Sequence, residues 1–251
     1  MSYISSKEFY FEVSKGNVAG HEAVLVGGLN VDLDLGVEED VWSPGGKLVE
    51  LTSAEIIDLT SDSAQDAVGQ TGISSILIVG LDGSGNSQFE FVTMTGLTIA
   101  KTLNSYLWVQ TLIGITCGSF TSNVGNITAT ATTSGTIQCG MPANTSLSQN
   151  GQYKVPTGKK AYMVAADLAA AKDSGGSSVI TYRGLVKNAG ATSPWVQIIT
   201  RKLDTAVIDQ IFIDQPISAA INAGSIFKFV GTADANNTEA RTRTYLVVVD
   251  D

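Results

Sequence analysis

The feature that most constrains the fold of this chain is the frequent interruption of its apolar runs by turn-forming residues. Valine, isoleucine, leucine and threonine fill short runs, and 26 glycines, together with serines and asparagines, separate them. β-Branched residues favour strands, whereas glycine, serine and asparagine favour the turns between strands. The sequence therefore predicts an all-β protein built from many short strands.

The predicted strands recur at the spacing that is typical of β-sandwiches. They lie at residues 9–13, 47–51, 55–60, 73–79, 88–95, 106–115, 126–133, 160–168, 179–186, 195–201, 207–213, 226–230 and 241–248. Alternation is clearest where Arg241, Arg243 and Tyr245 share one face, and at residues 88–94. Each such strand is expected to present one polar and one buried face. The alanine-rich stretch 165–172 is the only candidate helix, and we interpret it as a strand followed by a loop.

A polar, turn-rich stretch at residues 140–151 divides the strands into two series. We therefore expect two antiparallel, jelly-roll-like β-sandwich domains, residues 41–145 and residues 146–251. Residues 1–40 differ, because glycines interrupt every apolar run before a strand can lengthen. We expect an extended N-terminal arm there, which lies on a neighbouring copy or packs on the chain's own first domain. For the arm, we expect residues 1–35 to contribute more to assembly than to folding, because their glycines raise the entropy cost of ordering and their short apolar runs bury little on their own.

The sequence lacks the residue patterns of common catalytic sites. His21 is the single histidine, and without a partner at the spacing of a zinc site it is expected to be a turn or packing residue. We interpret the acidic residues 38–40 as a solvated loop, and Asp58, Asp62 and Asp66 as a solvated turn. A glycosidase would need two acids that face one groove. We expect no enzyme activity, no metal site and no cofactor.

Charge and hydropathy narrow the range of partners. Fifteen basic and 24 acidic residues give a net charge of −9, which repels the phosphates of nucleic acids. No apolar run is long enough for a membrane helix, and the first residues lack the pattern of a secretory signal. We expect a product made in a cytosol that binds neither nucleic acid nor membrane. Cys117 and Cys139 are expected to be free thiols.

The three tryptophans are candidates for a core, an interface or a stacking contact with a sugar ring. For Trp42, Trp108 and Trp195 we favour core packing or an interface. The alternative for Trp195 is a glycan contact, because the face of an exposed indole ring suits the apolar face of a sugar.

Arg241 and Arg243 form a basic ladder in an otherwise acidic protein. One interpretation is that the ladder keeps an edge strand solvated. The other is an ion-pair seam between subunits of a homo-oligomer, for which we favour a trimer. The partners would then be the carboxylates of residues 38–40 in an adjacent copy. The sequence leaves both interpretations open.

Several short strings follow one another in a recognisable order. They are Gly-Asn-Val-Ala-Gly-His at 16–21, Glu-Asp-Val-Trp-Ser-Pro-Gly-Gly at 39–46, Gly-Leu-Asp at 80–82, Asn-Val-Gly-Asn-Ile at 123–127 and Tyr-Lys-Val-Pro-Thr-Gly-Lys-Lys-Ala-Tyr at 153–162. In this order and spacing the sequence resembles a group of virion structural proteins from tailed bacteriophages, many of them marine. The resemblance implies a non-enzymatic β-sandwich component of the virus particle, on the capsid or in the tail.

Residues and resemblance together predict a capsid decoration or cement protein, synthesised in the cytoplasm of a bacterial host and located in the virion. The expected partners are the major capsid protein and copies of the chain itself. The candidate interface residues are His21, Trp42, Arg241 and Arg243. The alternative is a tail-associated, receptor- or glycan-binding β-sandwich module, for which Trp195 is the candidate contact.

Overall fold

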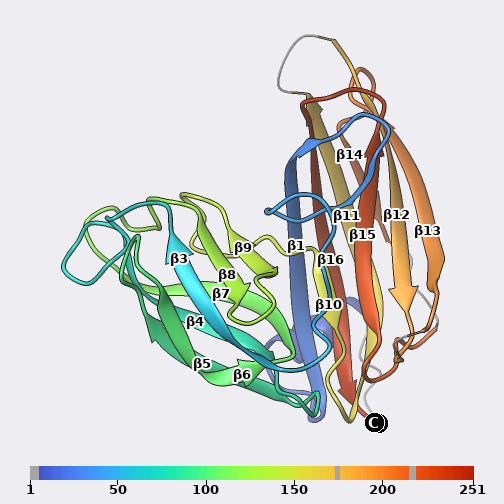
Figure 1. The fold of residues 1–251 in the computed structure, drawn as a ribbon. Coiled ribbons are helices and arrows are strands. Elements are labelled where there is room, and N and C mark those ends of the chain that lie inside the picture. Colours follow the sequence, from blue (N-terminus) through green and yellow to red (C-terminus); the bar gives the residue numbers. More distant parts are fainter. Residues whose placement is uncertain (1–5, 173–175, 191, 215–218) are drawn as a thin grey trace.

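A computed structural model describes residues 6–172, 176–190, 192–214 and 219–251, and strands dominate it (Figure 1). The described residues form one helix and sixteen strands. Every ladder between these strands is antiparallel. The strands group into two sandwiches, which confirms the prediction of an all-β sandwich protein.

The second sandwich contains the first two strands of the chain and most of its C-terminal half. One sheet has the order β1 (His21–Leu33), β16 (Thr238–Asp250), β11 (Lys159–Lys172) and β14 (Gln210–Ile213). The facing sheet has the order β10 (Gln152–Lys154), β15 (Ile226–Ala233), β12 (Val179–Lys187) and β13 (Trp195–Asp204), and β2 (Glu38–Asp40) also pairs with β15. Between the sheets lies an apolar core that includes Tyr182, Phe227, Phe229 and Leu246.

The first sandwich is built from a continuous stretch of chain. One sheet has the order β6 (Ala100–Tyr106), β3 (Glu55–Ser61), β8 (Ile127–Ala131) and β9 (Ile137–Met141). The other has the order β5 (Ser87–Thr93), β4 (Ile73–Leu81) and β7 (Trp108–Cys117). Its core contains Ile57, Leu59, Ile76, Ile78 and Leu112, all fully buried.

The N-terminal segment departs from the predicted arm. Strand β1 pairs with β16 from His21 opposite Val249 to Leu33 opposite Thr238, so residues 21–33 belong to the second sandwich. The glycines do not break this strand. A Cβ atom at Gly28 would lie 2.3 Å from the carbonyl oxygen of Val41, so glycine permits a close backbone approach.

Two predicted strands are wrong, and five strands were missed. Residues 9–13 lie in helix α1 (Ser6–Ser14), and residues 47–51 form an irregular connection between the sandwiches. The missed strands are β1, β2, β6, β9 and β10. The stretch 165–172 belongs to strand β11, which confirms the interpretation as a strand rather than a helix, but the predicted loop is wrong because the strand continues to Lys172. Among the described residues, no helix is long and apolar enough to cross a membrane.

The sandwiches meet at a small apolar cluster. Leu81 and Trp108 of the first sandwich pack against Ile226 of the second, and Leu48 of the connecting segment joins them. The side chain of Gln110 brackets the backbone of Lys154, because its Nε2 donates to the Lys154 carbonyl at 2.5 Å and its Oε1 accepts from the Lys154 N–H at 3.2 Å. These contacts fix the position of β10 beside β7.

Candidate functional site

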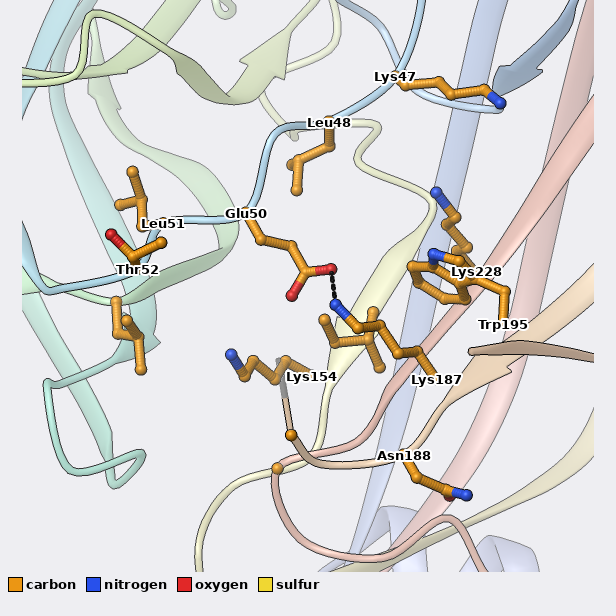
Figure 2. A pocket seen from close by; sticks show the side chains of 14 residues that line it. Lys47, Leu48, Glu50, Leu51, Thr52, Lys154, Lys187, Asn188, Trp195 and Lys228 are labelled. Carbon is orange, nitrogen blue, oxygen red and sulfur yellow. Dashed lines mark hydrogen bonds and ion pairs between the residues drawn. The ribbon is translucent and has the colours of Figure 1, made fainter. Parts of the chain in front are cut away.

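Next to this cluster, a cavity of about 510 Å³ opens between the two sandwiches (Figure 2). Trp195 lies at its wall at the start of β13, with 37% of its surface exposed. The ammonium groups of Lys228 and Lys187 lie 4.4 Å and 6.0 Å from the centroid of its ring, close enough for cation–π contacts. The structure thus places the candidate glycan contact in a real cavity.

Four lysines line the cavity, and they come from four separate segments. Lys47 belongs to the connecting segment, Lys154 to β10, Lys187 to β12 and Lys228 to β15. Only the fold brings them together, because Lys47 and Lys228 are 181 positions apart in the sequence. The cluster was not predicted, because no two of these lysines are close in the sequence.

Three of the four ammonium groups have carboxylate partners. Lys187 Nζ lies 2.7 Å from Glu50 Oε1, the ion pair drawn in Figure 2. Lys47 pairs with Glu38 at 3.2 Å, and Lys228 with Asp40 at 2.5 Å. Because each of these ammonium groups lies beside a carboxylate, the three pairs together carry no net charge.

Lys154 differs from the other three lysines. Among the described residues it makes no ion pair, and its ammonium lies 5.6 Å from the centroid of the Trp108 ring. Burial lowers the pKa of Lys154, nearby Lys187 lowers it further, and Glu50 opposes the shift. The cavity therefore holds one half-buried cation without a carboxylate partner.

The acidic residues 38–40 are not the solvated loop that we predicted. Asp40 is fully buried, and besides Lys228 its carboxylate accepts hydrogen bonds from the Leu48 N–H at 2.8 Å and Gln152 Nε2 at 3.2 Å. Glu39 is also buried and accepts a hydrogen bond from Asn30 Nδ2 at 2.8 Å. A buried carboxylate needs such partners to offset its lost hydration, so this run holds the second sandwich together.

The local charge is opposite in sign to that of the chain. Arg183 pairs with Glu38 beside Lys47 in an adjoining cavity of about 250 Å³ that Trp195 and Lys228 also line. The four lysines and Arg183 face three carboxylates, those of Glu38, Asp40 and Glu50. This leaves an excess of two positive charges at the cavity of a chain whose net charge is −9. A cationic cavity with low-dielectric walls attracts anions.

The predicted interface residues do not form one surface. Trp42 is 3% exposed, and its indole N–H donates to the Gly45 carbonyl at 2.8 Å. It is therefore a core residue, which corrects the interface prediction. His21 is half-buried at the start of β1, where its Nδ1 lies 3.0 Å from the Ala19 carbonyl and its ring packs edge-on against Phe9 at 5.6 Å.

Arg241 and Arg243 are exposed on one face of β16, as the alternation predicts. Their strand lies between β1 and β11, so the interpretation as an edge strand is wrong. Arg241 pairs with Glu239 of its own strand. The carboxylates of residues 38–40 bind partners within their own chain. The prediction that they pair with the arginines of an adjacent copy is therefore wrong.

The first sandwich exposes an apolar surface on its strand β5 and the neighbouring strands. Phe89 and Phe91 on β5 are 65% and 63% exposed, and their rings meet edge-on at 6.5 Å. Phe89 lies opposite Val79 of β4, and Phe91 opposite Leu77, which in turn lies opposite Ile113 of β7. We call the face formed by Phe89, Phe91, Leu77, Val79 and Ile113 the β5–β4–β7 face.

The polar side of β5 explains why the phenylalanines face outward. The Glu90 carboxylate accepts hydrogen bonds from the N–H groups of Leu103 and Asn104 at 3.0 and 3.3 Å, and Gln88 Nε2 donates to the Ser105 carbonyl at 2.6 Å. These bonds join the edges of the two sheets of the first sandwich. The alternation predicted for this strand is therefore confirmed, but Phe89 and Phe91 lie on its exposed face, and Val92 lies on its buried face.

The β5–β4–β7 face continues into a groove against β1. The groove has a volume of about 530 Å³, and Val79, Ile113 and Leu147 line it opposite Val24 and Leu25. Leu25 is itself more than half exposed. Apolar side chains from both sandwiches thus line this groove.

Asp66, predicted to lie in a solvated turn, is instead a buried hub of the first sandwich. Its carboxylate accepts hydrogen bonds from Ser61 Oγ at 2.6 Å and from the N–H groups of Ile73, Val124 and Gly125 at 2.9 to 3.0 Å. Both carboxylate oxygens of Asp66 thus accept hydrogen bonds from groups of the same chain. Within the described ranges, histidine, cysteine, aspartate and glutamate form no group of three or more that could hold a metal ion.

Comparisons with known proteins give no assignment. No protein family model matches the sequence, and no curated protein matches it. Among solved structures, one alignment is with "The 2.6A structure of Infectious Bursal Virus Derived T=1 Particles". The identity is 10%, the alignment covers 92% of this chain and 70% of that one, and the TM-score is 0.16. A TM-score this low carries no argument about the chain.

Proposed function

We propose that this chain is a non-enzymatic structural protein of a bacteriophage virion, and that it binds the head shell as a decoration or cement protein. The observation that supports this most is the exposed β5–β4–β7 face. Monomeric proteins rarely expose a contiguous apolar patch of more than a few hundred Å², and larger patches mark interaction sites. Phe89 and Phe91 would be anchor residues of such a site.

The surroundings of the face suit a rigid contact. Each of its strands also contributes side chains to the core of the first sandwich, so little backbone freedom is lost on binding. Large aromatic side chains of this kind carry much of the binding energy in protein interfaces. An interface of standard size, about 1,200 to 2,000 Å² in total, would extend over the face and the neighbouring groove.

The sequence resemblance supports the class of partner. The strings at residues 80–82 and 123–127 lie in the first sandwich, which carries the β5–β4–β7 face, and those at residues 39–46 and 153–162 lie in the second sandwich and its connection to the first. A subunit present in many copies on a repetitive shell gains avidity from contacts that are individually weak. Such a subunit needs two stable sandwiches and exposed contact surfaces.

Co-sedimentation with heads assembled without this chain tests the proposal. The unaltered chain should sediment with the heads. The double substitution Phe89→Ser and Phe91→Ser should weaken binding by about tenfold or more, because it removes both anchors. The matched control is Phe212→Ser on β14, where the phenylalanine is equally exposed but lies on the other sandwich. Failure of the unaltered chain to bind, or unchanged binding by the double variant, would overturn the proposal.

The cavity at Trp195 favours a second function, that of a tail-associated module which binds a host glycan. Trp195 and the polar side chains of Thr52 and Asn188 line one cavity, a combination that suits a sugar ring with hydroxyl groups. Adsorption of the purified full-length chain to host cells tests this function. Adsorption that disappears in Trp195→Ala supports it, and absence of adsorption counts against it.

A further inference from the structure

We propose that the cavity between the sandwiches binds an acidic sugar, whose carboxylate or phosphate group is held by Lys154. This inference deepens the second candidate function, on which it rests, and it does not depend on head binding. It names the chemical class of the ligand and the residue that selects it.

The first argument is the position of Lys154. Its backbone is held on both sides by Gln110, and its ammonium lies against the Trp108 ring. Placing a cation in a partly desolvated site without a carboxylate costs free energy, which an anionic ligand would offset. The fixed backbone means that little ordering is needed when the ligand binds.

The second argument is the charge around Lys154. Figure 2 shows Lys154 and Lys187 extending into the same cavity beneath Glu50. Glu50 pairs with Lys187 and leaves Lys154 without a partner. One anionic group on the ligand would complete the charge balance of this trio, whereas a neutral sugar would leave it incomplete.

The third argument is the size and lining of the cavity. A volume of about 510 Å³ lies in the range of small-ligand pockets. Thr52 and Asn188 offer hydrogen bonds to hydroxyl groups, and Trp195 and Ile226 offer apolar contact. Hydroxyls, an apolar ring face and one negative charge together describe an acidic sugar better than an acidic peptide, which needs several cations along an extended groove.

The test is a titration of the full chain with sugars at low salt, in which NMR chemical shifts or calorimetry detect binding. The probes are glucuronic acid and glucose 6-phosphate, with glucose as the neutral analogue. The two acidic probes distinguish a carboxylate from a phosphate ligand, and binding of either one supports the proposal. Binding should weaken as the ionic strength rises. Glucose should bind about tenfold more weakly or not at all.

Variants separate charge selection from folding. Lys154→Gln should lower the affinity by about tenfold, whereas Lys160→Gln, at an exposed lysine paired with Asp251, should leave it unchanged. Glu50→Gln should raise the affinity, because it removes the carboxylate that competes with the ligand for the lysines. A gain in affinity is not explained by misfolding. Absence of acidic-sugar binding by a chain that still adsorbs to host cells through Trp195 would contradict this inference alone, so its failure is distinguishable from failure of the second candidate function.

Three results would overturn the proposal. The first is that glucose binds as tightly as the acidic sugars. The second is that the chain binds neither glucuronic acid nor glucose 6-phosphate. The third is binding of an oligo-glutamate peptide by a chain that ignores the sugars, which would assign the cavity to a protein partner.

Discussion

The ammonium of Lys228 lies 2.5 Å from the carboxylate of Asp40, and both side chains are buried beside Trp195. Asp40 is on β2 and Lys228 on β15, so the pair joins the N-terminal part of the chain to the second sandwich. Through the Leu48 N–H, the same carboxylate also holds the segment that leads to the first sandwich. One buried ion pair thus connects three parts of the chain.

Asp40→Asn should destabilise the protein by about 3 to 5 kcal/mol, because it leaves the Lys228 ammonium buried without an opposite charge. Chemical denaturation followed by tryptophan fluorescence measures this loss. The control is Asp251→Asn, which removes a solvent-screened surface ion pair with Lys160 and should change stability little. Equal stability of the two variants would contradict the structural role of the buried pair.

Asp66→Ala should destabilise the first sandwich by about 3 kcal/mol or more. The substitution leaves the N–H groups of Ile73, Val124 and Gly125 without their acceptor, and each buried unsatisfied donor costs about 1 to 3 kcal/mol. The measurement is the free energy of unfolding from urea denaturation. Asp209→Ala, at an exposed carboxylate, is the control and should change stability little.

Removal of residues 1–35 should abolish the cooperative melting of the second sandwich, because it deletes strand β1 and exposes the edge of β16. This reverses the expectation that glycine content alone suggests for the N-terminal segment. A chain that lacks only residues 1–18 keeps β1 and should retain the transition. Calorimetry of the two truncated chains measures the difference. A normal transition in the shorter chain would show that β1 is dispensable.

At pH 8, one thiol of the folded protein should react with a thiol reagent, and the second only after unfolding. Cys117 is exposed, whereas Cys139 is buried in the first sandwich. Burial raises the pKa of Cys139 to about 12, so its reactive thiolate is scarce until the pH approaches that value. Kinetic counting of thiols in buffer and in denaturant tests this. In the control Cys117→Ser, no thiol should react in buffer. Rapid reaction of both thiols of the unaltered chain in buffer would contradict the prediction.

The strand content was predictable from the sequence because apolar β-branched runs and turn residues act locally. This holds for β4, β8 and β16, where pattern and structure agree closely. Free thiols at Cys117 and Cys139 were also predicted correctly. Strand β1 was missed because Gly28 looks like a strand breaker, although its role is to admit the backbone of Val41.

The candidate site was less predictable, because it depends on contacts between distant segments. Alternation in β5 indicates two different faces, but the hydrogen bonds of Glu90 to β6 decide that Phe89 and Phe91 face outward. Trp195 could be proposed from its residue type alone. The lysines around it could not, since only the packing of both sandwiches brings Lys47 and Lys154 to one cavity.

The central claim is that many copies of this chain decorate a phage head. Quantitative mass spectrometry of purified particles, calibrated against the major capsid protein, tests it most directly. We expect on the order of hundreds of copies per particle, because a decoration subunit follows the symmetry of the shell. A count of about six or twelve copies, as for a tail ring, or absence from the particle, would contradict it.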